Sequence, residues 1–512
     1  MASKSNEQIV MLPFMAHGHL IPFLALARQI HQATGFTISI ASTALNIQYL
    51  TSTFNSSSDE PNNDHIHLVE LPFCSNDHGL PPNTENSENL SLDLVGKLFS
   101  ASLSLRTPFH SFVGDIAAKQ GHPPLCIISD IFFGWAGEVA DSLGTVNVSF
   151  STGGAYGTLA YSSLWLNLPH RGRGDSDEFH LPGFPDRCRF HITQLHHFLR
   201  NADGTDSWSK FFQPQISLSM QSFGWLCNTV EEFEPEGLEW LRKFVKLPVW
   251  AIGPLLPPVV LKNDSSSLVI SSGISTRRAG KRPEISTEKC MEWLESYSPG
   301  SVLYVSFGSQ NSISPSQMME LAIGLEESAK PFIWVVRPPV GFDKKCDFRA
   351  EWLPDGFEER MKNRKQGLLV RNWAPQLEIL SHMSTGAFLS HCGWNSVLES
   401  LSQGMPIIGW PLAAEQAYNS KMLVEEMGVG VELTRGVQSS IDWKEVKKVI
   451  ELVMDKKGKG GDMRNKAMVI KEQLRASVRD EGEDKGSSVK ALDHLMRTLE
   501  SKRQVISSTS TI

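Results

Sequence analysis

The chain has 512 residues, which is too long for one hydrophobic core and predicts two domains of roughly 200–250 residues each. Hydrophobic residues make up 41% of the sequence and charged residues 20%, so both domains can bury ordinary cores. The formal net charge of -8 provides no basic surface for a polyanion, which argues against nucleic acid as a partner.

The seven cysteines are dispersed and include no CxxC pair, so they predict reduced thiols and not a disulfide framework. The apolar run before His17 is too short for the core of a signal peptide, and no run of about 18 apolar residues follows it. We therefore expect a cytoplasmic protein that does not insert into a membrane. We also expect a monomer.

Short apolar runs alternate with helix-length segments along the chain, which is the pattern of parallel α/β units. In the first half, strands are predicted at 9–15, 36–42, 65–73, 125–129, 147–150 and 224–227, and a helix at 22–33. From 254 to 284 the chain is rich in Pro, Ser, Gly and charged residues, which predicts a linker or a long exposed loop. Strands resume at 301–307, 332–336, 367–370, 386–390, 406–409 and 430–433, with helices that include 315–328 and 395–403.

The predicted fold is therefore α/β, with two Rossmann-like halves around one linker. Parallel sheets of this kind bind ligands at the carboxyl ends of their strands. Two such domains that face each other would each bring one ligand to a shared cleft. Functional residues are therefore expected where a strand meets a loop.

The segment 373–416 is the most informative stretch, and it contains such a junction. A predicted strand at 386–390 runs into the tight loop His391-Cys-Gly-Trp394, and a helix follows. A loop at a helix N-terminus presents free N–H groups and the positive end of the helix dipole, which suits a diphosphate. His391 and the Ser396 hydroxyl can add hydrogen-bond donors. From these residues alone, Ser396 and Glu399 could equally form a capping box, and the tryptophans could be core.

The whole segment, WAPQLEILSHMSTGAFLSHCGWNSVLESLSQGMPIIGWPLAAEQ, resembles the signature of plant secondary-product glycosyltransferases, the UDP-dependent family 1 enzymes. The resemblance implies a GT-B type fold, in which two Rossmann-like domains face each other across a cleft. It implies an acceptor-binding domain at 1–253, a linker at 254–284 and a UDP-sugar-binding domain at 285–486. It also implies a helix at 487–502 that crosses back to the first domain. The composition of 503–512 predicts a disordered tail.

The resemblance further implies the residues that contact the UDP-sugar. They are Ser309, Trp373, Ala374, Gln376, His391, Trp394, Asn395, Ser396, Glu399, Glu415, Gln416 and Thr152. Trp373 would stack on the uracil and Glu399 would accept hydrogen bonds from the ribose hydroxyls. Ser309, His391, Asn395 and Ser396 would hold the diphosphate, and Trp394, Glu415 and Gln416 would line the sugar. The terminal residue Gln416 usually accompanies glucose in this family, so UDP-glucose is the expected donor, with UDP-galactose, UDP-xylose and UDP-rhamnose as alternatives.

A candidate base follows the first predicted strand. His19 lies in a Gly-His-x-x-Pro sequence that the family also carries, and the pKa of histidine suits proton transfer near neutral pH. Asp130, in Asp-Ile-Phe after the strand at 125–129, matches the family's carboxylate that would orient the base. From the sequence alone, Asp130 could also cap a helix. His17 and His19 could suggest a metal site, but no third ligand lies nearby, so we expect no metal and no cofactor.

The implied reaction is an inverting transfer of the sugar to a hydroxyl group of a small lipophilic acceptor, such as a flavonoid, another phenolic or a terpenoid. Phe14, Phe132 and Trp135 are candidates for lining the acceptor, although each could be core. A dehydrogenase would carry GxGxxG after an early strand, and this chain does not. A binding protein of the same fold that lacks catalysis is the other alternative, but it would need no base.

Overall fold

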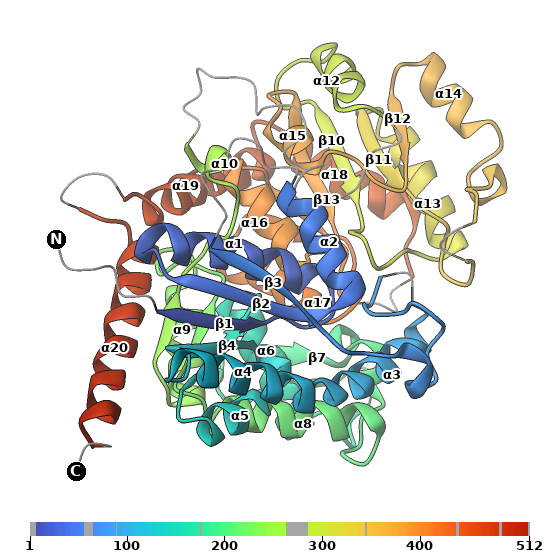
Figure 1. Ribbon diagram of the computed structural model, residues 1–512. Coiled ribbons are helices and arrows are strands. Elements are labelled where there is room, and N and C mark those ends of the chain that lie inside the picture. The colour runs from blue at the N-terminus through green and yellow to red at the C-terminus, as the bar shows by residue number, and fades with distance from the viewer. Residues whose placement is uncertain are drawn as a thin grey trace.

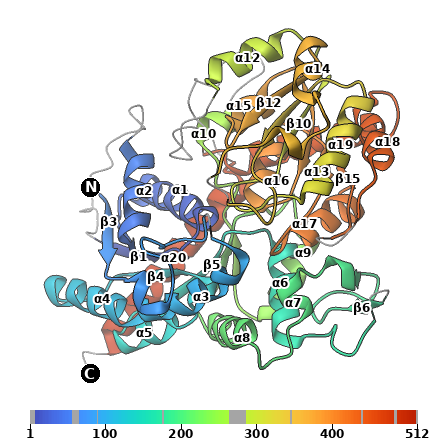
Figure 2. The ribbon, with the colours of Figure 1, turned by 90° about the vertical axis from the view of Figure 1, so that its right-hand side faces the viewer.

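The computed structural model describes residues 7–55, 65–88, 90–174, 177–262, 285–343, 346–436, 440–480 and 484–509. These residues form two α/β domains, each built on a parallel sheet with helices on its faces (Figure 1). A second view shows the two domains facing each other, with α16 and α17 of the C-terminal domain turned toward α6 and α9 of the N-terminal domain (Figure 2).

The N-terminal domain contains a seven-stranded parallel sheet in the order β3-β2-β1-β4-β5-β8-β9. Its strands are β1 Gln8–Leu12, β2 Thr37–Thr43, β3 Ile66–Leu71, β4 Cys126–Asp130, β5 Asn147–Ser151, β8 Gly224–Cys227 and β9 Val249–Ala251. Every residue of β1 and β4 is buried, as expected for central strands that are covered on both faces. A separate antiparallel hairpin pairs β6 Glu178–His180 with β7 Arg189–His191.

The connections of this domain are mostly helical. The α-helices are α1 His17–Thr34, α2 Ala44–Asn55, α3 Leu92–Ser102, α4 Arg106–Gln120, α5 Ala136–Ser142, α6 Ala155–Asn167, α7 His197–Arg200, α8 Ser207–Ser219, α9 Pro235–Val245 and α10 Pro258–Lys262. Short 3-10 helices are Ser75–His78, Leu103–Leu105, Ile131–Phe133 and Ile192–Gln194.

The C-terminal domain contains a six-stranded parallel sheet in the order β12-β11-β10-β13-β14-β15. Its strands are β10 Val302–Ser306, β11 Phe332–Val336, β12 Gly367–Arg371, β13 Thr385–Ser390, β14 Ile407–Gly409 and β15 Gly430–Glu432. The α-helices are α12 Thr287–Glu295, α13 Pro315–Glu327, α14 Phe357–Asn363, α15 Gln376–Ser381, α16 Trp394–Ser402, α17 Gln416–Lys421, α18 Trp443–Met454, α19 Lys459–Ser477 and α20 Ser487–Thr509. A 3-10 turn spans Ala350–Trp352, and a π-helix spans Met422–Glu426.

The strand orders place one ligand-binding crevice in each domain. In the first sheet β1 lies between β2 and β4, and in the second β10 lies between β11 and β13. The connections that leave β1 and β4, or β10 and β13, therefore run to opposite sides of the sheet, and a crevice opens at the carboxyl ends of those strands. Predicted catalytic or donor residues lie at both of these points. In the first domain His19 follows β1 and Asp130 is the last residue of β4, and in the second Ser309 follows β10 and His391 follows β13.

Several element boundaries differ from those predicted. The first strand ends at Leu12 and α1 begins at His17, because the chain turns between them and Pro22 is tolerated inside the helix. The described part of the linker, 254–262, includes the short helix α10, and 263–284 lies outside the described residues. The tail predicted at 503–512 is helical as far as Thr509, as a continuation of α20. Residues 510–512 lie outside the described part.

The last helix, α20, joins the N-terminal domain although it belongs to the end of the chain (Figures 1 and 2). Leu492, Leu495 and Leu499 are buried in one cluster with residues of β1, β2 and α1. The indole N–H of Trp250 donates to His494 Nδ1 at 2.8 Å, which ties β9 to the helix. The first strand and the last helix of the described chain therefore share one hydrophobic core.

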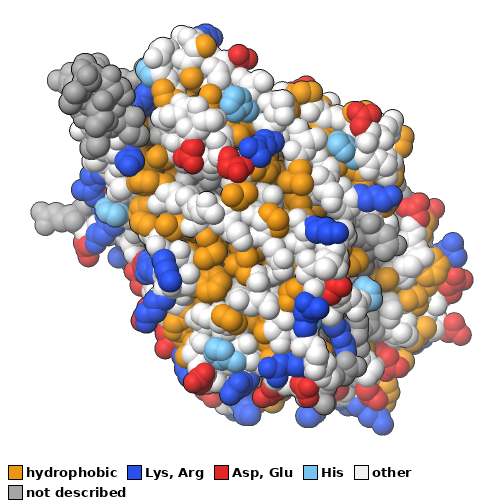
Figure 3. Space-filling view, turned by 90° about the horizontal axis from the view of Figure 1, so that it is seen from below, with side chains coloured by type: hydrophobic (Ala, Val, Ile, Leu, Met, Phe, Trp, Pro, Cys, Tyr) orange, Lys and Arg blue, Asp and Glu red, His pale blue; other side chains and the backbone are white. Residues whose placement is uncertain are grey.

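The lower face of the molecule in Figure 1 is shown in a space-filling view (Figure 3). On this face basic and acidic side chains are interspersed, and apolar ones gather between them. The face does not concentrate the positive charge that nucleic-acid binding requires. None of the helices in the described ranges is long and apolar enough to cross a membrane.

We predict that Leu495→Ala destabilises the protein by about 2–5 kcal/mol, because it opens a cavity in a core that spans both ends of the chain. Leu495 is fully buried in that cluster. Glu500→Ala, an exposed position on the same helix, is the control and should change stability by less than about 0.5 kcal/mol. Urea denaturation followed by circular dichroism measures both. Equal stability of the two variants would show that α20 is not part of the core.

Candidate active site

The structure brings His19 and Asp130 into direct contact although 111 residues separate them. His19 Nδ1 lies 2.6 Å from Asp130 Oδ2, and the Thr152 hydroxyl lies 3.4 Å from the same nitrogen. The second carboxylate oxygen of Asp130 accepts a hydrogen bond from the Phe132 N–H at 3.0 Å. Asp130 therefore caps the 3-10 turn that follows β4, as the sequence allowed, and orients His19 as well.

Burial and charge act in opposite directions on His19. Burial by itself would lower the pKa of His19, but the charge and the hydrogen bond of Asp130 raise it above the ordinary value of 6.5. The carboxylate of Glu415, from the other domain, raises the pKa of His19 further. The Asp130 side chain is fully buried, whereas 23% of the His19 side chain is exposed. His19 is thus the reachable member of the pair.

Aromatic side chains pack around His19. The ring centres of Phe14 and Phe132 each lie 5.6 Å from that of His19. Phe132 is half-buried and also packs on Phe212, at 5.2 Å, so apolar surface extends away from the dyad. Trp135 lies elsewhere: it is 2% exposed and packs in the core behind Phe133. Phe14 is also buried, at 0% exposure, so Phe132 is the most exposed of the three residues predicted to line the acceptor. Their contact with an acceptor stays a prediction.

On the C-terminal side, His391 lies between two glycines. A Cβ atom on Gly308 would come within 2.6 Å of His391 Nε2, and one on Gly393 would also collide with that nitrogen. Gly308 has a left-handed φ of 73°, which glycine adopts without strain. Burial, with a smaller contribution from the charge of Arg337, lowers the pKa of His391 to about 4. His391 is therefore neutral near pH 7 and has one N–H to donate.

The helix α16 begins without a side-chain cap. Gly393 is its N-cap residue, and no side chain there accepts a hydrogen bond. Ser396 and Glu399 do not form a capping box. The amide of Gln376 donates instead to the Ser396 hydroxyl at 3.0 Å and to Glu399 Oε2 at 2.5 Å. The first N–H groups of α16 are thus not satisfied by a side-chain cap, which is compatible with an anion site.

The residues predicted to bind the nucleoside lie around the start of α15. The Gln376 carbonyl accepts from the Tyr304 hydroxyl at 3.3 Å, which fixes the orientation of the amide. Glu399 and Trp373 are half-buried, and Ala374 is buried in the core beneath them. The structure therefore gathers Trp373, Gln376 and Glu399 within one short stretch of the crevice wall.

The residues predicted to line the sugar are held differently from one another. Gln416 is buried, and its side-chain carbonyl accepts from the backbone N–H groups of Leu412 and Ala413, each at 2.9 Å. Its amide nitrogen is therefore the end that can donate to a sugar hydroxyl. Burial raises the pKa of Glu415, and His19 lowers it. The Trp394 indole N–H donates to the Asn228 carbonyl at 2.7 Å, so this side chain is engaged in contact with the other domain.

A second contact between the domains forms where Pro22 leaves a backbone carbonyl of α1 without its helical hydrogen bond. Pro22 lies inside α1 and has no N–H to donate to the Gly18 carbonyl four residues earlier. The side-chain amide of Asn395, from the start of α16, donates to that carbonyl at 3.2 Å. The helix start predicted to hold the diphosphate is thereby joined to the helix that carries His19.

Three charged residues near the site were not found from the sequence. Glu234 is buried and accepts from the N–H groups of Ala155 and Tyr156, which caps α6 next to the Thr152 loop. Arg337 holds the turn after β10, and the Glu88 carboxylate lies 3.3 Å from Nδ1 of His17. No local signal marks these residues, because their partners are distant in sequence. In the described part of the chain, no group of three or more His, Cys, Asp or Glu is placed to hold a metal ion.

Comparison with known proteins identifies the family. A family model described as UDP-glucoronosyl and UDP-glucosyl transferase matches residues 276–467, and one described as glycosyltransferase, N-terminal domain, matches residues 6–163. The chain is 43% identical over 503 residues to UDP-glycosyltransferase 92A1 of Arabidopsis thaliana, with 97% of each chain covered. It is 47% identical over 465 residues to crocetin glucosyltransferase 3 of Crocus sativus, with 90% and 93% covered.

The chain belongs to the plant family 1 UDP-glycosyltransferases. The predicted family and enzyme class are therefore confirmed. The structure of Glycyrrhiza uralensis UGT73P12 with glycyrrhetinic acid 3-O-monoglucuronide is similar, with a TM-score of 0.80, 27% identity and coverage of 99% and 98%. That of Phytolacca americana UGT2 with UDP-2fluoro-glucose and pterostilbene has a TM-score of 0.72, 27% identity and coverage of 96% and 100%. The predicted GT-B type fold is confirmed as well.

For this glycosyltransferase we predict that Gly308→Ala weakens UDP binding roughly tenfold or more, because the new methyl group displaces His391 from the diphosphate loop. Gly300→Ala is the matched control. Gly300 also has a left-handed φ, of 62°, but its Cβ would meet nothing closer than Arg464, at 3.4 Å. Isothermal titration calorimetry with UDP compares the two variants. If both bound UDP like the wild type, His391 would have no part in holding the diphosphate.

Proposed function

We propose that this enzyme transfers glucose from UDP-glucose to a hydroxyl group of a small lipophilic plant metabolite, a flavonoid, another phenolic or a terpenoid, with inversion at the anomeric carbon. The contact of 2.6 Å between His19 and the buried Asp130 is the observation that carries the proposal. A protein that only bound nucleotide sugars would have no need for a reachable base held by a buried carboxylate.

In the proposed reaction His19 acts through Nε2, because its Nδ1 faces Asp130 and Thr152. Nε2 takes the proton of the acceptor hydroxyl while the acceptor oxygen attacks the anomeric carbon. The bond from that carbon to the phosphate oxygen breaks, and UDP leaves with the electron pair, through an oxocarbenium-like transition state. Asp130 stabilises the imidazolium that forms.

The leaving diphosphate is proposed to be stabilised by the first turn of α16, by His391 and by Ser309. Ser309 is exposed at the turn after β10, and α16 begins without a side-chain cap. Backbone N–H groups that are already oriented stabilise developing negative charge without reorganisation. The proposal includes no metal and no cofactor.

The choice of glucose rests on Gln416. Its carbonyl is engaged with the backbone of its own loop, so its amide nitrogen is the end that can donate a hydrogen bond. In the family resemblance, glutamine at this position accompanies glucose. Transfer from UDP-galactose, UDP-xylose or UDP-rhamnose is the alternative.

A lipophilic acceptor is supported by the rings around His19. Phe14, Phe99 and Phe132 pack on one another within 6 Å, and Phe132 continues to Phe212 and Tyr161. Flat apolar molecules bind well to aromatic surface of this kind.

The test combines four UDP-sugars (glucose, galactose, xylose and rhamnose) with a mixed phenolic and terpenoid library, read by mass spectrometry. We expect glucosides as the main products. His19→Ala should lower the rate by about 10²–10⁴-fold, because the base is lost, while UDP still binds. His110→Ala, an exposed histidine on α4, should not change the rate. Equal rates for His19→Ala and the wild type, or no product with any donor, would contradict the proposal.

The pH dependence follows from the raised pKa of His19. The base must be neutral, so kcat/KM for the acceptor should fall as the pH drops through a midpoint above 6.5. Asp130→Asn removes the main cause of the raised pKa, so the midpoint should move to lower pH while the plateau rate falls. Rates between about pH 5 and 9 at saturating UDP-glucose measure both quantities. A midpoint that stayed in place in Asp130→Asn would exclude His19 as the titrating group.

A further inference from the structure

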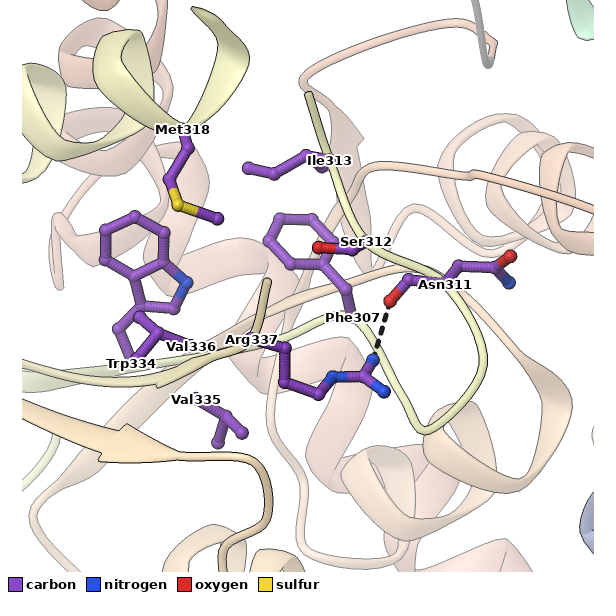
Figure 4. Close-up of a pocket in the computed structure, with 9 residues that line it drawn as sticks. All are labelled: Phe307, Asn311, Ser312, Ile313, Met318, Trp334, Val335, Val336 and Arg337. Atoms are coloured by element: carbon purple, nitrogen blue, oxygen red, sulfur yellow. Dashed lines mark hydrogen bonds between the residues drawn. The ribbon is translucent and has the colours of Figure 1, made fainter. Parts of the chain in front are cut away.

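The side chain of Arg337 clamps the turn that follows β10. Arg337 follows the last residue of β11, and its guanidinium group donates to the backbone carbonyls of Ser309 at 2.5 Å, of Asn311 at 2.6 Å and of Gly308. Figure 4 shows the side chain extending from the wall of a small pocket toward this turn. One side chain therefore holds three backbone carbonyls of a glycine-containing turn.

Arg337 also places a positive charge beneath the diphosphate loops. Burial lowers the pKa of Arg337 to about 10, and the charge of Glu88 opposes that effect, so the guanidinium stays protonated near neutral pH. Its charge contributes to the lowered pKa of His391. The guanidinium therefore contacts the turn after β10, and its charge also acts on His391 in the loop after β13.

Residues 87 and 88, in the N-terminal domain, contact the clamped turn and the start of α1. The Oε2 atom of Glu88 lies 3.3 Å from Nδ1 of His17, the first residue of α1. The ring of His17 stacks on Tyr49, with 3.8 Å between the ring centres. The neighbouring residue Ser87 accepts a hydrogen bond from the side chain of Gln310, in the clamped turn, at 2.5 Å. Residues 87–88 thus join the start of the helix that carries His19 to the turn held by Arg337.

We propose that Arg337 is a positioning residue for the donor, because its guanidinium keeps the 308–311 turn in the shape that accepts the diphosphate. The proposal rests on the diphosphate contacts of the proposed function. The planar fork of arginine can serve several carbonyls at once, which the single ammonium group of lysine cannot. Because the turn contains a glycine, it has little preference of its own for this shape.

The test compares UDP with uridine as ligands in isothermal titration calorimetry. We expect Arg337→Met to weaken UDP binding roughly tenfold or more, because a charged hydrogen-bonded group is lost. Uridine binding should be unchanged, because Trp373, Gln376 and Glu399 lie at the other end of the donor site. Arg337→Lys keeps the charge but loses the fork, so it should also bind UDP more weakly than the wild type. Arg349→Met, an exposed arginine of the same domain, is the control and should bind both ligands normally.

The proposal is wrong if Arg337→Lys binds UDP like the wild type, or if any Arg337 variant loses UDP and uridine to the same degree. If the wild type does not bind UDP, the proposed function itself fails. The ratio of UDP to uridine affinity in the variants tests only the role of Arg337.

Discussion

The contact between His19 and Asp130 depends on the pairing of two parallel strands. β1 and β4 are neighbours, with Leu12 beside Ser129, so the residues that follow them emerge at the same edge of the sheet. A fully buried carboxylate is costly unless it is paired and hydrogen-bonded. Asp130 meets that condition only because the Phe132 N–H and the His19 ring both lie within reach. The position of the base is thus set by the sheet topology and by the need to satisfy one buried charge.

The two crevices are joined by contacts that involve the donor residues themselves. Asn395 donates to the carbonyl that Pro22 leaves without its helical partner, and Trp394 donates to Asn228. Both residues belong to the first turn of α16, which is proposed to hold the diphosphate. A displacement of that turn would therefore change the separation between the base and the donor. Binding of the donor and placement of the base are physically linked for this reason.

Much of this arrangement could be predicted from the sequence, and the exceptions have a common cause. The strands at 224–227 and 332–336 were predicted with the bounds that the structure shows, because buried parallel strands are short apolar runs. The donor segment could be recognised because its residues are contiguous. Arg337 and Glu88 could not, since each acts on residues brought near only by the fold. The sequence also could not distinguish the half-buried Phe132 from the buried Phe14 and Trp135, because it does not determine which way each side chain points.

The two ends of the proposed site differ in how sharply they can discriminate. At the donor end, Gln376, Gln416 and Glu399 are held by hydrogen bonds, so a donor that failed to pair with them would leave buried polar groups unsatisfied. Such sites reject an ill-matched ligand by large factors, whereas an apolar pocket separates similar ligands by only about 10–200-fold. The rings around His19 are apolar and therefore discriminate weakly among acceptors. We therefore expect this enzyme to be strict toward its nucleotide sugar and tolerant among acceptors of similar shape.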